Sequence, residues 1–195
     1  MTSASRPAPT NGRRIPGEIG VWIIVFGDLF VFSLFFLIFA VYQKDQPALF
    51  AQARATLNQT FGLLNTLLLL TSSWWVGMAM ADQTRRRSRT AKAKIGFAML
   101  CGLCFVSLKI LEYREKLQAG SKPTSNDFYM LYFCFTGIHL LHVTIGLGAL
   151  FFVYRQLGRK EPSLHQGALV EGCTIFWHLV DVLWIILFAL FYLKG

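Results

Sequence analysis

The chain has 195 residues, of which 54% are hydrophobic and 15% are charged, and its net charge is +9. Ordinary soluble proteins carry roughly 25% charged residues, so this composition excludes an ordinary soluble domain. The basic residues lie in short segments between long apolar runs, which indicates membrane orientation rather than nucleic-acid binding. All four cysteines lie inside apolar runs, which is unlike the disulfide framework of a secreted protein.

Residues 1–17 are rich in Ser, Pro, Arg and Ala and show no periodicity, which predicts a disordered cytoplasmic tail. A signal peptide is the competing interpretation, because basic residues precede an apolar run. The run over residues 19–42 is too long for the hydrophobic region of a signal peptide and lacks a small-residue cleavage site. We therefore expect it to remain as the first span of a membrane domain over residues 18–195.

Five apolar stretches are long enough to cross a membrane, which needs about 20 helical residues for roughly 30 Å of hydrocarbon. They cover residues 19–42, 61–81, 93–111, 128–154 and 172–193. Lipid offers no water to the backbone amides, so each stretch must be helical. The sequence predicts an all-α integral membrane bundle of five transmembrane helices.

The orientation of this bundle follows from the distribution of Lys and Arg. With the N-terminus inside, twelve of them lie in or beside the inner segments: Arg6, Arg13, Arg14, Arg85, Arg86, Arg87, Arg89, Lys92, Lys94, Arg155, Arg159 and Lys160. Six lie in the outer segments: Lys44, Arg54, Arg114, Lys116, Lys122 and Lys194. The excess predicts a cytoplasmic N-terminus and a C-terminus outside.

Eight ionisable side chains lie in or next to the spans, where each charge costs roughly 2.5–3.5 kcal/mol and asks for a reason. They are Asp28, Lys109, Glu112, His139, His142, Glu171, His178 and Asp181. Pairs three residues apart share a helix face, and Lys109 with Glu112 can form an ion pair. Asp28, His142 and Asp181 lie at similar depth. We expect a buried polar network that joins the first, fourth and fifth spans, with His178 and Asp181 packed against His139 and His142.

Three interpretations of this network compete. The first is structural, with hydrogen bonds that fix helix packing. The second is a metal or haem site; a di-iron bundle would need Glu-x-x-His on two helices, but Thr136 and Ile175 occupy the Glu positions. The third is a proton relay through Asp28, His142 and Asp181. The sequence has no phosphate-binding glycine loop, Ser/His/Asp order or zinc spacing, so nothing indicates an independent enzyme.

Two histidine-bearing segments carry a specific family resemblance. Residues 133–146, with His139 and His142, resemble the penultimate helix of cytochrome c oxidase subunit III, and residues 177–184 resemble its last helix. The match runs in order from residue 19 onward. Within the family the chain is similar to the short five-helix branch, and its Gly27-Asp28 and Lys109-x-x-Glu112 motifs resemble the NorE-type members associated with nitric oxide reductases.

This resemblance implies a non-catalytic subunit of a haem–copper oxidase complex, of cytochrome c oxidase or nitric oxide reductase type, in the respiratory electron transport chain of the bacterial inner membrane. Members hold no haem or copper themselves and have no catalytic residues. They pack on subunit I, with subunit II as a second expected neighbour, bind structural phospholipid, and support stability, proton uptake and gas entry. The resemblance assigns lipid binding to Arg155 and Asp28, and no residue to a metal.

A second hypothesis is a small b-type membrane cytochrome, with haem ligated by His142 or His139 and by His178. The four histidines of the chain are too few for the two haems and copper of a catalytic subunit. A transporter is disfavoured, because the sequence shows no internal repeat or pair of broken helices.

Overall fold

The computed structural model describes residues 19–157 and 164–193, and these residues form six α-helices and no strand. The helices are α1 (Ile19–Asp45), α2 (Pro47–Ala55), α3 (Gln59–Thr84), α4 (Ser88–Gln118), α5 (Asp127–Gln156) and α6 (Leu164–Tyr192). Five of them are long and apolar enough to cross a membrane, so the all-α class and the five spans are confirmed. The predicted tail over residues 1–17 lies outside the described residues.

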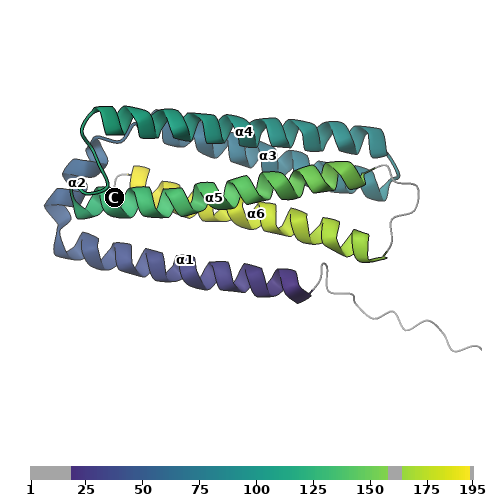
Figure 1. Ribbon diagram of the computed structural model, residues 1–195, viewed down its shortest axis with the longest axis horizontal. Helices are drawn as coiled ribbons and strands as arrows, with labels where there is room; N and C mark the ends of the chain where they lie inside the picture. Colours follow the sequence, from purple (N-terminus) through teal and green to yellow (C-terminus); the bar gives the residue numbers. More distant parts are fainter. Residues whose placement is uncertain (1–18, 158–163, 194–195) are drawn as a thin grey trace, which may run out of the picture.

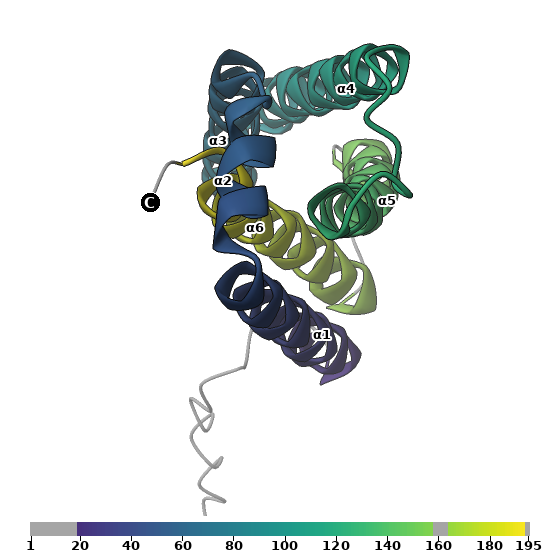
Figure 2. The ribbon, with the colours of Figure 1, turned by 90° about the vertical axis from the view of Figure 1, so that its left-hand side faces the viewer.

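The prediction of five helices missed the short helix α2, because Pro47 was interpreted as a breaker of the connecting segment. Pro lies in the first turn of α2, where its missing N–H would have no partner within the helix. The helix is held to the bundle by Phe50, whose ring packs edge-on against Phe39 at 5.4 Å and against Phe128 at 5.4 Å. α2 therefore closes one end of the bundle (Figure 2).

The long helices extend beyond the predicted apolar stretches, because polar residues continue the helices at their ends. The N-termini of α3 and α5 are capped by asparagine: Asn58 accepts a hydrogen bond from the Thr60 amide at 3.0 Å, and Asn126 accepts one from Tyr129 at 2.9 Å. The largest difference is at α6, which begins at Leu164 rather than at residue 172.

The five long helices run side by side, with α2 and the end of α6 at the same end of the bundle (Figure 1). α6 occupies the middle, where it contacts α3, α5 and α1, while α1 lies at the periphery (Figure 2). Half of the residues in the apolar window of α6 are buried (50%), compared with 17% in α1. α6 therefore forms the core of the bundle and α1 an outer layer.

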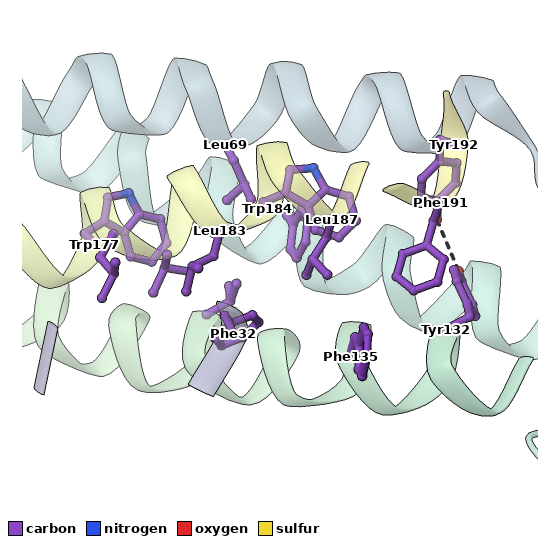
Figure 3. Close-up of a cluster of buried hydrophobic side chains, with 14 of the residues drawn as sticks. Phe32, Leu69, Tyr132, Phe135, Trp177, Leu183, Trp184, Leu187, Phe191 and Tyr192 are labelled. Carbon is purple, nitrogen blue, oxygen red and sulfur yellow. Dashed lines mark hydrogen bonds between the residues drawn. The ribbon is translucent and has the colours of Figure 1, made fainter. Parts of the chain in front are cut away.

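Large aromatic side chains of α6 fill this core (Figure 3). One of them, Trp177, is approached closely by α4 and by α5 at glycine positions. A Cβ at Gly146 would lie 2.8 Å from Cε3 of Trp177, and a Cβ at Gly102 would lie 3.0 Å from its Cη2. α4 and α5 approach the indole of Trp177 this closely only because both positions lack a side chain. About two turns further along α6, Trp184 donates a hydrogen bond to the hydroxyl of Thr66 at 3.0 Å, which joins α6 to α3.

Candidate functional site

The most completely bonded polar group in the bundle is Lys109 of α4, which is 0% exposed. Its ammonium donates to Glu112 at 3.0 Å, to the Tyr132 hydroxyl at 3.1 Å and to the Tyr192 hydroxyl at 2.9 Å. Tyr192 in turn donates to the second carboxylate oxygen of Glu112 at 2.5 Å. An ammonium has three N–H donors, so all three are satisfied here. We call these four residues the Lys109 network.

Aromatic faces complete the surroundings of this ammonium. Nζ of Lys109 lies 4.9 Å from the ring centroid of Trp184 and 5.0 Å from that of Tyr132, within the range of cation–π attraction. The sequence predicted the pair with Glu112 but not the two tyrosines, which come from α5 and α6. Their position inside apolar runs could have identified these tyrosines as partners, since a buried hydroxyl usually needs a hydrogen-bond partner. The network ties three helices together.

His139 of α5 packs against aromatic rings rather than against polar groups. Its ring lies 5.3 Å from Trp184 and 5.8 Å from Phe105, centroid to centroid, and the residue is 0% exposed. Within the described parts of the chain neither ring nitrogen has a hydrogen-bond partner. The indole of Trp184 is thus a neighbour of both His139 and the Lys109 ammonium.

His142 of α5 contacts Asp28, which joins the peripheral helix α1 to the core. Its Nδ1 lies 2.8 Å from the carbonyl oxygen of Ile138, and Nε2 lies 3.4 Å from Oδ1 of Asp28. A carbonyl oxygen only accepts, so the proton of that first bond belongs to Nδ1. The second contact then needs one further proton, on the imidazole or on the carboxyl group. The pair borders a mainly apolar pocket of about 330 Å³ between α1, α5 and α6.

His178 and Asp181 of α6 do not join the histidines of α5. Nδ1 of His178 lies 2.5 Å from the hydroxyl of Ser73 on α3, which replaces the predicted contact with His139 and His142. Asp181 is 3% exposed, as expected for an inward-facing side chain. Its carboxylate oxygens meet no hydrogen-bond partner among residues 19–157 and 164–193. The α6 residues therefore face α3 and the core.

Glu171 and Arg155 lie near the other end of the bundle from α2, and both are exposed. Glu171 borders a cavity of about 460 Å³ between the ends of α3, α5 and α6. The guanidinium of Arg155 lies 5.9 Å above the ring of Phe151, which lines a groove shared with α4. Asp28 belongs to α1 and contacts α5 through His142. The two residues predicted to bind lipid therefore lie on different sides of α5: Arg155 beside the groove shared with α4, and Asp28 on the side that faces α1.

In place of one continuous network, the described part of the chain shows separate contacts, among them the Lys109 network, Asp28 with His142, and His178 with Ser73. The physical reason is that α1, α3 and α4 approach different faces of the α5–α6 pair. His142 and His178 therefore point to different helices, an arrangement that does not support haem ligation between them. No group of three or more His, Cys, Asp or Glu that could hold a metal ion occurs in the residues that the structure describes.

Comparison with known proteins identifies the family of this chain. The sequence model described as Cytochrome c oxidase subunit III matches residues 17–195. The chain belongs to the cytochrome c oxidase subunit III family. It is 27% identical over 176 residues to the cytochrome bo(3) ubiquinol oxidase subunit 3 of Pseudomonas aeruginosa, which covers 90% of this chain and 84% of the relative.

Two further relatives are named as cytochrome c oxidase subunit 3. That of Bacillus sp. (strain PS3) is 25% identical over 199 residues, covering 100% of this chain and 96% of the relative. That of Synechocystis sp. is 29% identical over 208 residues, covering 99% and 87%. With its five apolar helices, this subunit III-family protein is a multi-pass protein of the bacterial inner membrane and a non-catalytic member of an oxidase complex. The alternative of an independent b-type cytochrome is not supported.

Proposed function

We propose that this protein is an accessory subunit that packs on the catalytic subunit I of a haem–copper complex and supports its stability, proton uptake and access of the substrate gas. In this proposal the chain carries no cofactor and no catalytic residue. The observation that supports it best is the use of its charged side chains. All three donors of the buried Lys109 ammonium are consumed inside the bundle, where they join helices rather than face a substrate.

Lipid binding through Arg155 is supported by the groove beside it. This groove of about 340 Å³ is lined by apolar residues of α4 and α5, among them Phe151 and Tyr154. Arg155 lies over the first of these rings, and Nζ of Lys92 lies 5.7 Å from the centroid of the second. Two cations at the end of an apolar groove suit a phosphodiester with an acyl chain below it, and a guanidinium binds phosphate in a bidentate fork.

Asp28 has a different role in this proposal. It faces the pocket between α1, α5 and α6, whose apolar lining suits a second acyl chain. Because the contact between Asp28 and His142 requires one shared proton, the pair itself is suited to take up and release a proton. Proton uptake and lipid contact are thus assigned to the same pocket, which is separate from the groove beside Arg155.

The NorE-type branch is the assignment that we favour, because Lys109 and Asp28 match the motifs of that branch. The expected partner is then the catalytic subunit of a nitric oxide reductase or of an oxidase, with subunit II as a further neighbour. Affinity purification of the tagged chain from its native membrane in mild detergent tests this directly. Recovery with a haem–copper subunit I is expected, and mass spectrometry of that subunit identifies the branch. Recovery of the chain alone would contradict the proposal.

The lipid assignment has its own test, in which phospholipid phosphorus is counted per purified chain. Arg155→Ala is expected to release lipid, with Lys92→Ala giving a smaller loss. Arg114→Ala is the matched control, because Arg114 is equally an exposed helical arginine but lies at the other end of the bundle. Equal lipid content in all three variants would argue against Arg155 as an anchor.

A further inference from the structure

The end of the bundle that is closed by α2 carries a second cationic groove. It lies between the last turn of α1 and α2, has a volume of about 470 Å³, and is lined by Gln43, Lys44 and Arg54 together with Ala40, Pro47, Phe50 and Ala51. Both cations and the carboxamide of Gln43 can donate hydrogen bonds. No acidic residue lines this groove in the described part of the chain.

Arg54 is an unusual member of this set, because its Nε atom is buried and meets no hydrogen-bond partner within residues 19–157 and 164–193. Neither Arg54 nor Lys44 forms an ion pair with another described residue. The nearby acidic side chains are otherwise placed: Asp127 accepts from Gln46 at 2.8 Å, and Asp45 is exposed outside the groove. A partly buried guanidinium with no counter-charge among the described residues favours the binding of an anion in this groove.

Burial also lowers the pKa of Arg54 from its ordinary value, because desolvation disfavours the charged form. The guanidinium remains charged at any physiological pH, so a bound anion would offset this desolvation. A phosphate oxygen pair matches the planar fork of an arginine, and an ammonium such as Lys44 adds a point charge.

We propose that this groove binds the phosphate of a membrane phospholipid, with Arg54 and Lys44 as its ligands. A lipid is favoured over free phosphate by what lies next to the groove. Ala40 lines it, and the adjacent α1 residues Leu37 and Val41 are 62% and 51% exposed, which continues an apolar surface down the helix for an acyl chain. Lys44 lies in the last turn of α1, at the depth where basic side chains extend to the headgroups.

The site is independent of the groove beside Arg155. That groove lies at the end of α5, whereas this one lies at the end of α1, on the opposite side of the membrane span (Figure 1). The two sites would hold lipids of opposite leaflets. The failure of one therefore says nothing about the other.

The test uses the full chain, purified in detergent and freed of lipid, then titrated with phosphatidylglycerol in mixed micelles. Bound lipids are counted by native mass spectrometry. We expect the double substitution Lys44→Gln and Arg54→Gln to weaken one binding event by at least about tenfold, because the loss of even one charge-assisted hydrogen bond has roughly that effect. Lys44→Gln alone, at an exposed position, should give an intermediate loss without disturbing the fold.

The matched control is Arg114→Gln, which removes an exposed arginine of α4 near the same end of the bundle. It should bind lipid as the unchanged protein does. A second arm adds inorganic phosphate as competitor, which should displace the lipid only in large excess. The proposal is overturned if the double variant and the control bind equally, or if inorganic phosphate binds as tightly as the lipid, which would make this a site for a free anion.

Discussion

α6 and α1 are both long apolar helices with an acidic side chain inside the span, yet they are built into the bundle in different ways. Half of the apolar window of α6 is buried, and its Tyr192 belongs to the Lys109 network. Only 17% of the corresponding window of α1 is buried, and its Asp28 makes a single longer contact of 3.4 Å to His142, with both side chains about one-fifth exposed.

This contrast in burial indicates which helices depend least on a partner. Helices α4 to α6 satisfy the buried charges of Lys109 and Glu112 among themselves, so this part is expected to hold together without a partner. α1 leaves most of its apolar surface to lipid or to another protein, and its polar contact is open to change. Removing one partner of a buried ion pair strongly destabilises the folded protein, whereas a partly exposed pair contributes little to its stability. Substitutions in the two regions should therefore change the free energy of unfolding by different amounts.

The largest effect is expected from Lys109→Met. It leaves the Glu112 carboxylate buried without its cation, which costs about 3–5 kcal/mol of the free energy of unfolding. Unfolding of the purified chain by denaturing detergent, followed by circular dichroism, measures this loss.

The double substitution Lys109→Met and Glu112→Gln is the control for that experiment. It removes both charges, so it should be less damaging than Lys109→Met alone. If Lys109→Met were as stable as the unchanged chain, the ammonium would not be the centre of the Lys109 network.

A smaller loss is expected from Gly146→Ala, because the new Cβ would lie 2.8 Å from the ring of Trp177. Overpacking of this kind costs typically 1–3 kcal/mol. Gly148→Ala on the same helix meets nothing within 4 Å and should be neutral or slightly stabilising, since alanine favours the helix. Thermal unfolding of the two variants side by side checks the difference; equal midpoints would contradict the close approach of α5 and α6.

Tyr192→Phe tests the contribution of the hydroxyl groups alone. The ring stays in place, but its hydrogen bonds to Lys109 and Glu112 are lost, at a cost of about 1–2 kcal/mol. Tyr154→Phe removes a hydroxyl from an exposed ring of α5 and should leave the unfolding free energy unchanged. If both variants behaved alike, the network would owe its strength to the ion pair only.

The smallest effect is expected at α1. Asp28→Asn keeps the shape of the side chain and removes the carboxyl group, so stability of the isolated chain should fall by less than about 1 kcal/mol. A double-mutant cycle with His142→Gln measures the coupling energy of the pair. A coupling as large as that between Lys109 and Glu112 would erase the proposed difference between α1 and the core.

Much of this structure follows from the sequence, but the partners of its polar residues do not. The length of the apolar stretches was sufficient to predict the five spans, and the three-residue spacing was sufficient to predict the ion pair between Lys109 and Glu112. α2 was missed because Pro47 breaks a helix in its interior yet suits its first turn. Tyr132, Tyr192 and Ser73 were missed because a contact between helices depends on which faces meet. Periodicity within one helix does not specify that.

We propose above all that His142 and His178 join helices and that the chain holds no cofactor. This proposal is tested most directly by measuring haem per mole of this chain after its complex has been purified and its subunits separated under mild conditions. We expect all haem to remain with the partner subunits and the chain alone to show no Soret absorbance. One haem per chain, lost in both His142→Ala and His178→Ala, would contradict it.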